Sequence, residues 1–338
     1  MAACGVAQAS TRVTRDVKAA VIYENGPPEV LRYEDIADPD CPEGCVLVDV
    51  EAISIEGGDL LARASSPPPS GPHVVGYLAA GKVVEVGAGV EQFSIGDRVV
   101  TMNAAGSHAS MRAVPAMSAW PLPDGVDAAT AACVPIAFGT AQECLFTAAN
   151  LTPGQTALIH AGAGGVGMAA IQLAKQAGAT VLATASSDEK LERLKEFGLD
   201  HGINYVTENF VERTRELTDV RGADVILDSI GGQNLIDSVA ALAYRGTLVS
   251  VGVAGRSGSN IEARDLWMKN NALRGVFLGG ALIAEYPRVS AMITDLVERV
   301  ARGELRVHID RTFQLAEAAD AHAYIERRAA FGRVVMSP

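Results

Sequence analysis

The stretch that decides the fold runs from Ala157 to Ser186 and reads ALIHAGAGGVGMAAIQLAKQAGATVLATAS. An apolar strand leads through a glycine-rich turn into an amphipathic helix, and a second strand follows. Glycines at 162, 164 and 167 give the spacing G-x-G-x-x-G. Such a loop lets the backbone approach a pyrophosphate, and the helix points free N–H groups at it. The context predicts a dinucleotide site rather than an unliganded turn. Its loop comprises Gly162, Ala163, Gly164, Gly165, Val166 and Gly167.

Downstream of this stretch, strands alternate with helices. Strands are predicted at 156–160, 180–185, 224–228 and 247–251, with a further one at 274–278, and helices at 165–177 and 188–197. This alternation is typical of a parallel sheet with crossover helices. The tail from residue 286 predicts two helices, the second at 316–328, and a last strand that could return to the first domain.

Upstream, the chain reads as short strands separated by Gly and Pro. They are predicted at 17–23, 45–52, 81–86 and 97–101, a pattern that suggests a barrel-like β domain. We expect four segments: a disordered extension at 1–16, a first β domain at 17–135, a dinucleotide domain at 136–280, and a return to the first domain at 281–338.

Composition excludes several classes of protein. The 338 residues are 49% hydrophobic and 20% charged, and the net charge of −12 disfavours binding to nucleic acid. No apolar run approaches the roughly 18 residues of a membrane span, and no secretory leader is evident, so we expect a cytoplasmic protein. The odd count of five cysteines argues against a disulfide framework. Cys41 and Cys45 have no neighbouring pair with which to complete a metal site.

The end of the second strand indicates which nicotinamide cofactor is used. NAD-binding proteins usually place Asp or Glu there, whereas residues 184–187 read TASS. Ser186, Ser187 and Lys190 could instead supply hydroxyl donors and a cation to a 2′-phosphate. The missing carboxylate therefore favours NADP(H). Ser186 with Glu189 also fits a helix capping box, and the two roles are compatible.

From about Lys18 onward the chain resembles the zinc-free medium-chain dehydrogenases/reductases, in particular the zeta-crystallin-like quinone oxidoreductases. The matching segments, in family order, are KAAVIYENGPPEVLRYED, GKVVEVGAGVEQFSIGDRV, FGTAQECLF, HAGAGGVG, INYVTENF, ADVILDSIGG, GTLVSVGVAG and AHAYIERRAAFGRVV. The resemblance implies an α/β fold: a Rossmann doubly wound parallel sheet plus a GroES-like β-barrel domain. It also implies an active site in the cleft between the two.

The resemblance also implies roles for individual residues. Thr140 matches a threonine near the nicotinamide, Lys190 a lysine on the 2′-phosphate, and Arg328 an arginine reaching the same region. Tyr205 matches a tyrosine beside the adenosine. The nicotinamide pocket would be lined by Val251, Gly252, Phe277 and Leu278. Alternatively, Thr140 caps its helix, Tyr205 is core, and Arg328 is a solvated helix residue.

The same alignment leaves no zinc site. Zinc-dependent relatives carry Cys and a His-Glu pair as ligands, but the first segment here reads AISIEGGDLLAR and the His-Glu position reads Gly76-Tyr77. His73 and His108 alone do not make a tetrahedral site. The quinone reductases carry Asn and Tyr where this chain has Glu56 and Leu61.

Glu56 therefore has two interpretations. It is a candidate catalytic group that would act as a general acid if desolvation raised its pKa. The favoured alternative is a loop carboxylate that faces solvent or pairs with Arg63.

The predicted function is a zinc-independent oxidoreductase that transfers hydride from NADPH to a quinone or similar activated carbonyl. The alternatives are an enoyl or 2-alkenal C=C reductase on the same scaffold and a non-enzymatic NADP-binding protein. The expected partner is a small-molecule acceptor, with neither nucleic acid nor membrane involved. A homodimer is expected through the Rossmann edge strand, which the segment ARDLWMKNNALRGVFLGG would supply.

Overall fold

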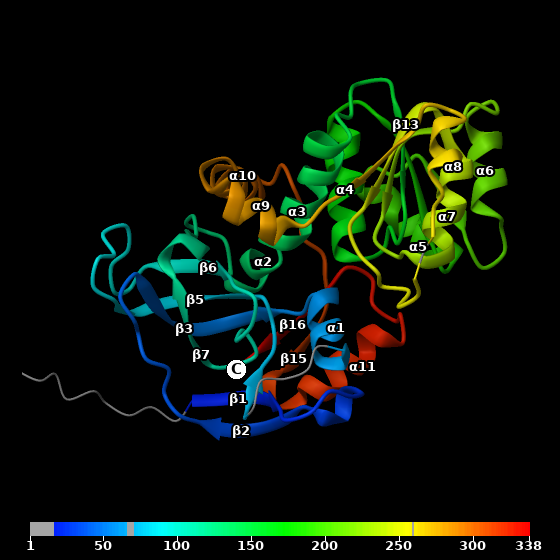
Figure 1. Ribbon diagram of the computed structural model, residues 1–338. Helices are drawn as coiled ribbons and strands as arrows, with labels where there is room; N and C mark the ends of the chain where they lie inside the picture. Colours follow the sequence, from blue (N-terminus) through cyan, green and yellow to red (C-terminus); the bar gives the residue numbers. More distant parts are fainter. Residues whose placement is uncertain (1–16, 66–70, 259) are drawn as a thin grey trace, which may run out of the picture.

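The structure, a computed structural model, describes residues 17–65, 71–258 and 260–338. The extension predicted at 1–16 lies outside the described residues. Two lobes are visible in Figure 1, one built on β-strands from both ends of the chain and one on a parallel sheet. The α/β fold class predicted from the sequence is confirmed. Within the described part, no helix is long and apolar enough to cross a lipid bilayer.

The strands are β1 (Val17–Ile22), β2 (Arg32–Ile36), β3 (Cys45–Ser54), β4 (His73–Val74), β5 (Leu78–Val86), β6 (Arg98–Met102), β7 (Met111–Pro115), β8 (Ala119–Pro121), β9 (Thr156–Ile159), β10 (Thr180–Ala185), β11 (His201–Asn204), β12 (Ala223–Asp228), β13 (Leu242–Ser250), β14 (Ala272–Gly275), β15 (Ile309–Gln314) and β16 (Arg333–Ser337). The α-helices are α1 (Gly57–Ser65), α2 (Ala128–Ala132), α3 (Pro135–Gln142), α4 (Gly165–Gln176), α5 (Asp188–Leu194), α6 (Phe210–Leu217), α7 (Gly232–Ala241), α8 (Ala263–Trp267), α9 (Leu278–Ala284), α10 (Tyr286–Ala301) and α11 (Ala318–Glu326). A π-helical turn (Glu143–Ala148) continues α3.

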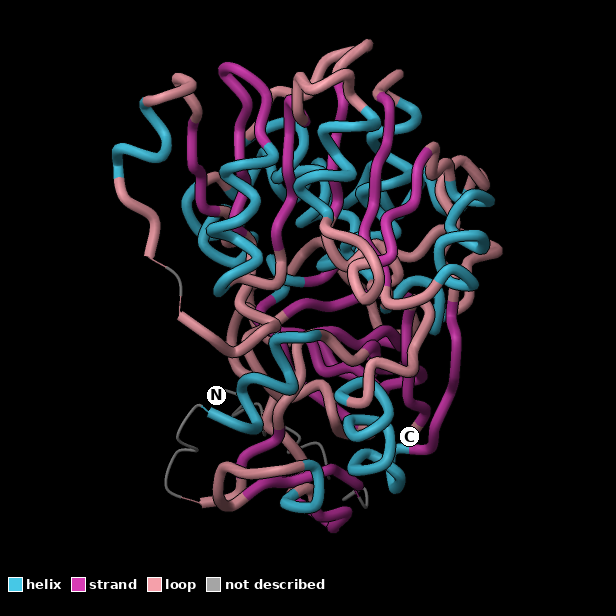
Figure 2. The backbone as a smooth tube through the Cα atoms, turned by 90° about the vertical axis from the view of Figure 1, so that its right-hand side faces the viewer, coloured by secondary structure: helices cyan, strands magenta, loops and turns pink. Residues whose placement is uncertain are grey.

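The parallel sheet has the order β11-β10-β9-β12-β13-β14. Chain order reverses between β9 and β12, and dinucleotides bind at such a switch point, beyond the carboxyl ends of the strands. Alternate residues of β9 point to opposite faces of the parallel sheet. Ala157 and Ile159 join a core with α3, α4 and α10, while Leu158 joins one with α6 and α7. Figure 2 shows the strands of this sheet side by side, with helices packed along them.

The other lobe is built on a sheet with the order β15-β16-β3-β5-β6-β8, to which β7 adds by pairing with β3. Strand β16, at the end of the chain, runs antiparallel to β3, with Val335 opposite Ser54. Residues 309–314 and 333–337 thus lie in the same sheet as residues 45–54 (Figure 1). A small sheet, β2-β1-β4, packs beside it.

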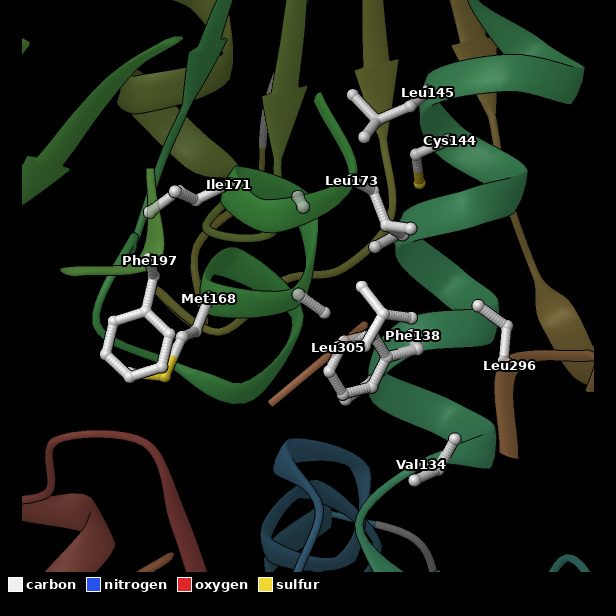
Figure 3. Close-up of a cluster of buried hydrophobic side chains, with 14 of the residues drawn as sticks. Val134, Phe138, Cys144, Leu145, Met168, Ile171, Leu173, Phe197, Leu296 and Leu305 are labelled. Carbon is white, nitrogen blue, oxygen red and sulfur yellow. The ribbon is translucent and has the colours of Figure 1, made fainter. Parts of the chain in front are cut away.

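One hydrophobic cluster connects the lobes. It includes Leu78 and Val100 of the barrel-side sheet together with Ala157 and Ile159 of the parallel sheet. Between them lie α3 and α4. In Figure 3, Phe138 lies on the side of α3 that faces α4. This shared core holds the two lobes against each other.

Some predicted segments differ from the observed ones. The strand predicted at 274–278 is β14, which ends at Gly275, and α9 begins at Leu278. The helix predicted at 188–197 ends at Leu194 and closes in a 3₁₀ turn before Gly198, whose φ of 105° ends it. Strand β13 begins at Leu242, five residues before the predicted start, because the chain pairs early with β12 across an irregularity in register.

Candidate active site

The glycine loop connects β9 to α4 at the switch point of the parallel sheet. Gly162 lies so close to β10 that a Cβ there would come within 2.8 Å of the Ala183 Cβ. A Cβ on Gly167 would overlap the Ala161 carbonyl. These two glycines therefore let the loop turn tightly against the sheet.

Helix α4 begins after Gly164 without a side-chain cap. The N–H groups of its first turn have no partner within the helix. They point, with the positive end of the helix dipole, out of the carboxyl end of the sheet. The residues present therefore fit the diphosphate of a dinucleotide, because a backbone nest without side chains is what that group requires.

Arg333, from the first position of β16, lies directly against this loop. A Cβ on Gly165 would overlap its guanidinium. The guanidinium donates hydrogen bonds to the Ser54 hydroxyl at 2.5 Å, to the Ile55 carbonyl at 2.9 Å, and to the Glu56 carboxylate. Both members of the Arg333–Glu56 ion pair are buried. The pair therefore links the last strand of the chain to the end of β3, at the level of the glycine loop.

The favoured interpretation of Glu56 from the sequence was wrong. Its side chain is only 3% exposed, and it pairs with Arg333 rather than Arg63, which instead binds Glu326 at 2.5 Å. Burial raises the pKa of Glu56, and the opposing charge of Arg333 and the Ser54 hydrogen bond offset this in part. Sequence reasoning missed Arg333. The available signal was a single charge at the head of an otherwise apolar terminal strand, RVVM.

Asp59 fixes the backbone around Glu56. Its carboxylate is fully buried, and it accepts hydrogen bonds from the Glu56 N–H at 2.8 Å and the Tyr77 N–H at 3.2 Å. Burial, followed by the charge of Glu56, raises its pKa well above the usual range. Cys133, just before α3, is also buried beside Ser54 and Arg333, and burial raises the pKa of its thiol. Three segments distant in sequence therefore meet here.

Thr140 lies in the interior of α3 and is 6% exposed. Helix α3 begins at Pro135, so the alternative that Thr140 caps its helix is wrong.

At the tip of β10, the residues assigned to the 2′-phosphate lie near one another. The Lys190 ammonium donates to the carbonyl oxygens of Arg328 at 2.8 Å and Ala330 at 2.9 Å. Arg328 is exposed and lies beyond the end of α11 with a φ of 56°, so it is not a helix residue. Tyr205, 37% exposed just after β11, is not core.

The cap of α5 differs from the prediction. Ser187, not Ser186, accepts the capping hydrogen bond from the Lys190 N–H, at 3.3 Å. The predicted box of Ser186 with Glu189 is therefore wrong, because the helix starts one residue later. Asp188 accepts a hydrogen bond from the Asn204 amide at 2.9 Å. Ser186 is thus not used by the cap, and the nearest carboxylate of this turn is engaged elsewhere.

The residues predicted from the sequence to line the nicotinamide pocket follow the ends of β13 and β14. Val251 and Gly252 directly follow β13 and are half-buried. Leu278, at the start of α9, is 5% exposed, whereas Phe277 is 79% exposed. Phe277 lines a surface pocket of about 450 Å³ between β14 and the π-helical turn. Neither the glycine loop nor Glu56 lines this pocket, so Phe277 is set apart from them.

Known proteins match this architecture along nearly the whole chain. A family model described as the alcohol dehydrogenase GroES-like domain matches residues 42–151, and one described as a zinc-binding dehydrogenase matches 165–295. A 2-haloacrylate reductase of Burkholderia is 34% identical, covering 95% of this chain and 99% of its own. A quinone oxidoreductase of Pseudomonas aeruginosa is 34% identical, covering 93% and 97%.

Among solved structures, the quinone oxidoreductase of Escherichia coli complexed with NADPH matches with a TM-score of 0.88 at 30% identity. The match covers 95% of this chain and 100% of that one. A GroES-like lobe joined to a Rossmann sheet with a glycine loop at its switch point defines the medium-chain dehydrogenase/reductase superfamily. Within it, this chain belongs to the quinone oxidoreductase family.

A zinc ion does not fit the residues present, although one matching family model is described as zinc-binding. Residues 165–295, which that model covers, contain no Cys and a single His, His201. In the described part of the chain, no group of three or more His, Cys, Asp or Glu side chains could hold a metal ion. No step is therefore assigned to a metal.

The buried ion pair leads to a stability prediction. Arg333→Met leaves the Glu56 carboxylate buried without its cation, and such losses cost about 3–5 kcal/mol. We expect urea unfolding at neutral pH to reveal a loss of this size. The pKa of Glu56, already raised by burial, rises further in the variant. A carboxyl with a raised folded-state pKa destabilises the fold above its unfolded pKa, so acidification to about pH 5 should restore part of the loss.

The control is the double variant Arg333→Met/Glu56→Gln, which removes both charges and should recover most of the stability. A loss of stability in Arg333→Met that neither acidification nor the added Glu56→Gln substitution relieves would contradict the pairing of Arg333 with Glu56.

Proposed function

We propose that this protein is a zinc-independent reductase that transfers hydride from NADPH to a quinone or a similar activated carbonyl compound. The observation that carries the proposal is the uncapped start of α4 at the switch point of the parallel sheet, with the Lys190 ammonium at the tip of the next strand. The chain is an enzyme of the oxidoreductase class, since two relatives that match more than nine-tenths of it are named 2-haloacrylate reductase and quinone oxidoreductase. The non-enzymatic alternative is therefore not retained.

The cofactor is NADP(H), with which the solved E. coli relative is complexed. We assign the diphosphate to the loop from Gly162 to Gly167, through the free N–H groups of the first turn of α4. We assign the 2′-phosphate to Ser186, Lys190 and Arg328, and the adenosine to the exposed ring of Tyr205. A cation and a hydroxyl suit a phosphate, and no carboxylate at the tip of β10 repels it.

We assign the nicotinamide end to the region between Thr140 of α3 and the segments after β13 and β14. This region would be lined by Val251, Gly252 and Leu278. Phe277 would line it only after its exposed ring turns inward. When bound, the reduced nicotinamide supplies a hydride. The protein contributes orientation and hydrogen bonds, which stabilise the charge that develops on the acceptor.

Glu56 is proposed as a charge-balancing group of this site. Since its carboxylate is held by Arg333 and the Ser54 hydroxyl, it is not poised to release a proton to the acceptor. Its burial keeps water away from the base of the glycine loop. This role differs from the general acid considered from the sequence.

A second candidate acceptor is a C=C bond beside a carbonyl. The relative named 2-haloacrylate reductase, 34% identical to this chain, favours it, since an acrylate contains such an alkene. Both reactions use the same hydride donor and differ in the shape of the acceptor pocket.

We also propose a homodimer formed through β14, at the edge of the parallel sheet. Exposed apolar side chains gather on the elements around this edge. Trp267 and Met268 are each 62% exposed and Leu273 is 39% exposed. An unpaired strand edge flanked by such side chains is a surface for a second copy. A cytoplasmic location remains a prediction that cell fractionation would test.

The acceptor and the cofactor are tested together. NADPH and NADH oxidation is followed against a panel of quinones and enones, with and without a metal chelator. We expect turnover with NADPH preferred and no effect of the chelator. Lys190→Ala should lower kcat/KM for NADPH about 10- to 100-fold, the loss of one charge-assisted hydrogen bond, and leave NADH nearly unchanged.

The matched control is Lys195→Ala on the 3₁₀ turn after α5, an exposed lysine paired with Glu192. An equal decline with both cofactors in Lys190→Ala would mean that Lys190 only anchors the loop around Arg328. No turnover of any acceptor by the wild type would contradict the proposed function.

The dimer is tested by light scattering. The wild type should have the mass of two 35.2 kDa chains at micromolar concentration. Trp267→Glu should shift it to one chain, because a buried unpaired carboxylate opposes association. Ile95→Glu, at an exposed site in the other lobe, should not. A wild type that runs as a monomer would rule the dimer out.

A further inference from the structure

Tyr77 lies close to the buried ion pair of Arg333 and Glu56. It stands immediately before β5, one residue beyond the pairing of Leu78 with Ser54. Ser54 is the residue whose hydroxyl holds Arg333 and Glu56. Tyr77 therefore lies at the end of the barrel-side sheet that faces the glycine loop.

The backbone of Tyr77 is held from both sides. Its N–H donates to the buried Asp59 carboxylate, and its carbonyl accepts from the Asn103 N–H at 3.0 Å and the Arg112 guanidinium at 3.0 Å. Asp59 binds the Glu56 N–H with its other oxygen. The position of Tyr77 is thus fixed relative to Glu56 through one shared carboxylate.

The ring of Tyr77 lies over the start of α1. A Cβ on Gly58 would overlap the ring and its hydroxyl oxygen, so only glycine at this position leaves room for the phenol. The ring also packs against the large hydrophobic cluster that connects the two lobes. The phenol therefore lies between the start of α1 and this shared core.

The hydroxyl of Tyr77 is free to bind a ligand. Within the described part of the chain the hydroxyl makes no hydrogen bond, and its oxygen is not buried. It therefore reaches solvent while its ring is half-buried. Burial and the nearby charges of Asp59 and Glu56 raise the pKa of Tyr77 above its ordinary value. At neutral pH the phenol is a hydrogen-bond donor.

We propose that the Tyr77 hydroxyl donates a hydrogen bond to the carbonyl oxygen of the acceptor. This inference rests on the proposed reductase function. As hydride reaches the acceptor, negative charge develops on that oxygen, and a fixed donor stabilises it. Tyr77 keeps its proton; water supplies the one that completes the reduction, and the nicotinamide is oxidised.

The test is Tyr77→Phe, which keeps the ring over Gly58 and removes only the oxygen. In single-turnover measurements with a quinone, we expect hydride transfer to slow roughly 100- to 1,000-fold, as for loss of one oxyanion donor. NADPH affinity and thermal stability should stay as in the wild type. Tyr33→Phe, on exposed β2, is the matched control and should change nothing. A Tyr77→Phe rate within twofold of the wild type would overturn the proposal.

A second readout does not depend on turnover. The infrared carbonyl stretch of ¹³C=O acetophenone is recorded on the NADP⁺ complex. A lowered frequency in the wild type that is lost in Tyr77→Phe is the expected result, and a merely structural role would not produce it. A wild type without the lowered band, or a Tyr77→Phe variant that retains it, would overturn the proposal. If the wild type reduces no acceptor yet has the lowered band, the reductase function fails while the donor role stands.

Discussion

The contact on which the rest of the site depends is the burial of Arg333 against Gly165. It requires the chain to return to its first sheet after completing the parallel one, since β16 must lie beside β3 for the guanidinium to reach Ser54 and Glu56. A buried cation needs a buried anion. The positive end of α4 adds to that need. The pair therefore lies where the barrel-side sheet touches the glycine loop, at the place where a diphosphate would bind.

The parallel sheet could be predicted from the sequence because its signals are local. Apolar strands of four to six residues alternate with helices around β9 to β12, and the glycine spacing marks the first crossover. The boundaries of elements that depend on tertiary contacts could not be predicted from the sequence. Strand β13 begins early because it pairs with β12 across an irregular register, and α9 begins where β14 leaves the sheet edge.

The candidate site also has one part that could be predicted from the sequence and one part that could not. The glycine loop and the group of Ser186, Lys190 and Arg328 follow from motif and resemblance, and the structure brings Lys190 and Arg328 into contact. The partner of Glu56 could not be found from sequence, because 277 residues separate it from Arg333. Tyr77 was equally hidden. The Tyr77 ring has room beside α1 only because Gly58 has no side chain. A glycine in a sequence does not show which group packs against it.

The measurement that tests the central claim most directly is a crystal structure of the NADP⁺ complex. The account predicts the diphosphate on the first turn of α4, with Arg333 still paired to Glu56 behind it. It also predicts the 2′-phosphate on Lys190 and the nicotinamide beside Thr140 and Tyr77. A dinucleotide bound elsewhere, as in the pocket beside Phe277, or a 2′-phosphate far from Lys190, would contradict it.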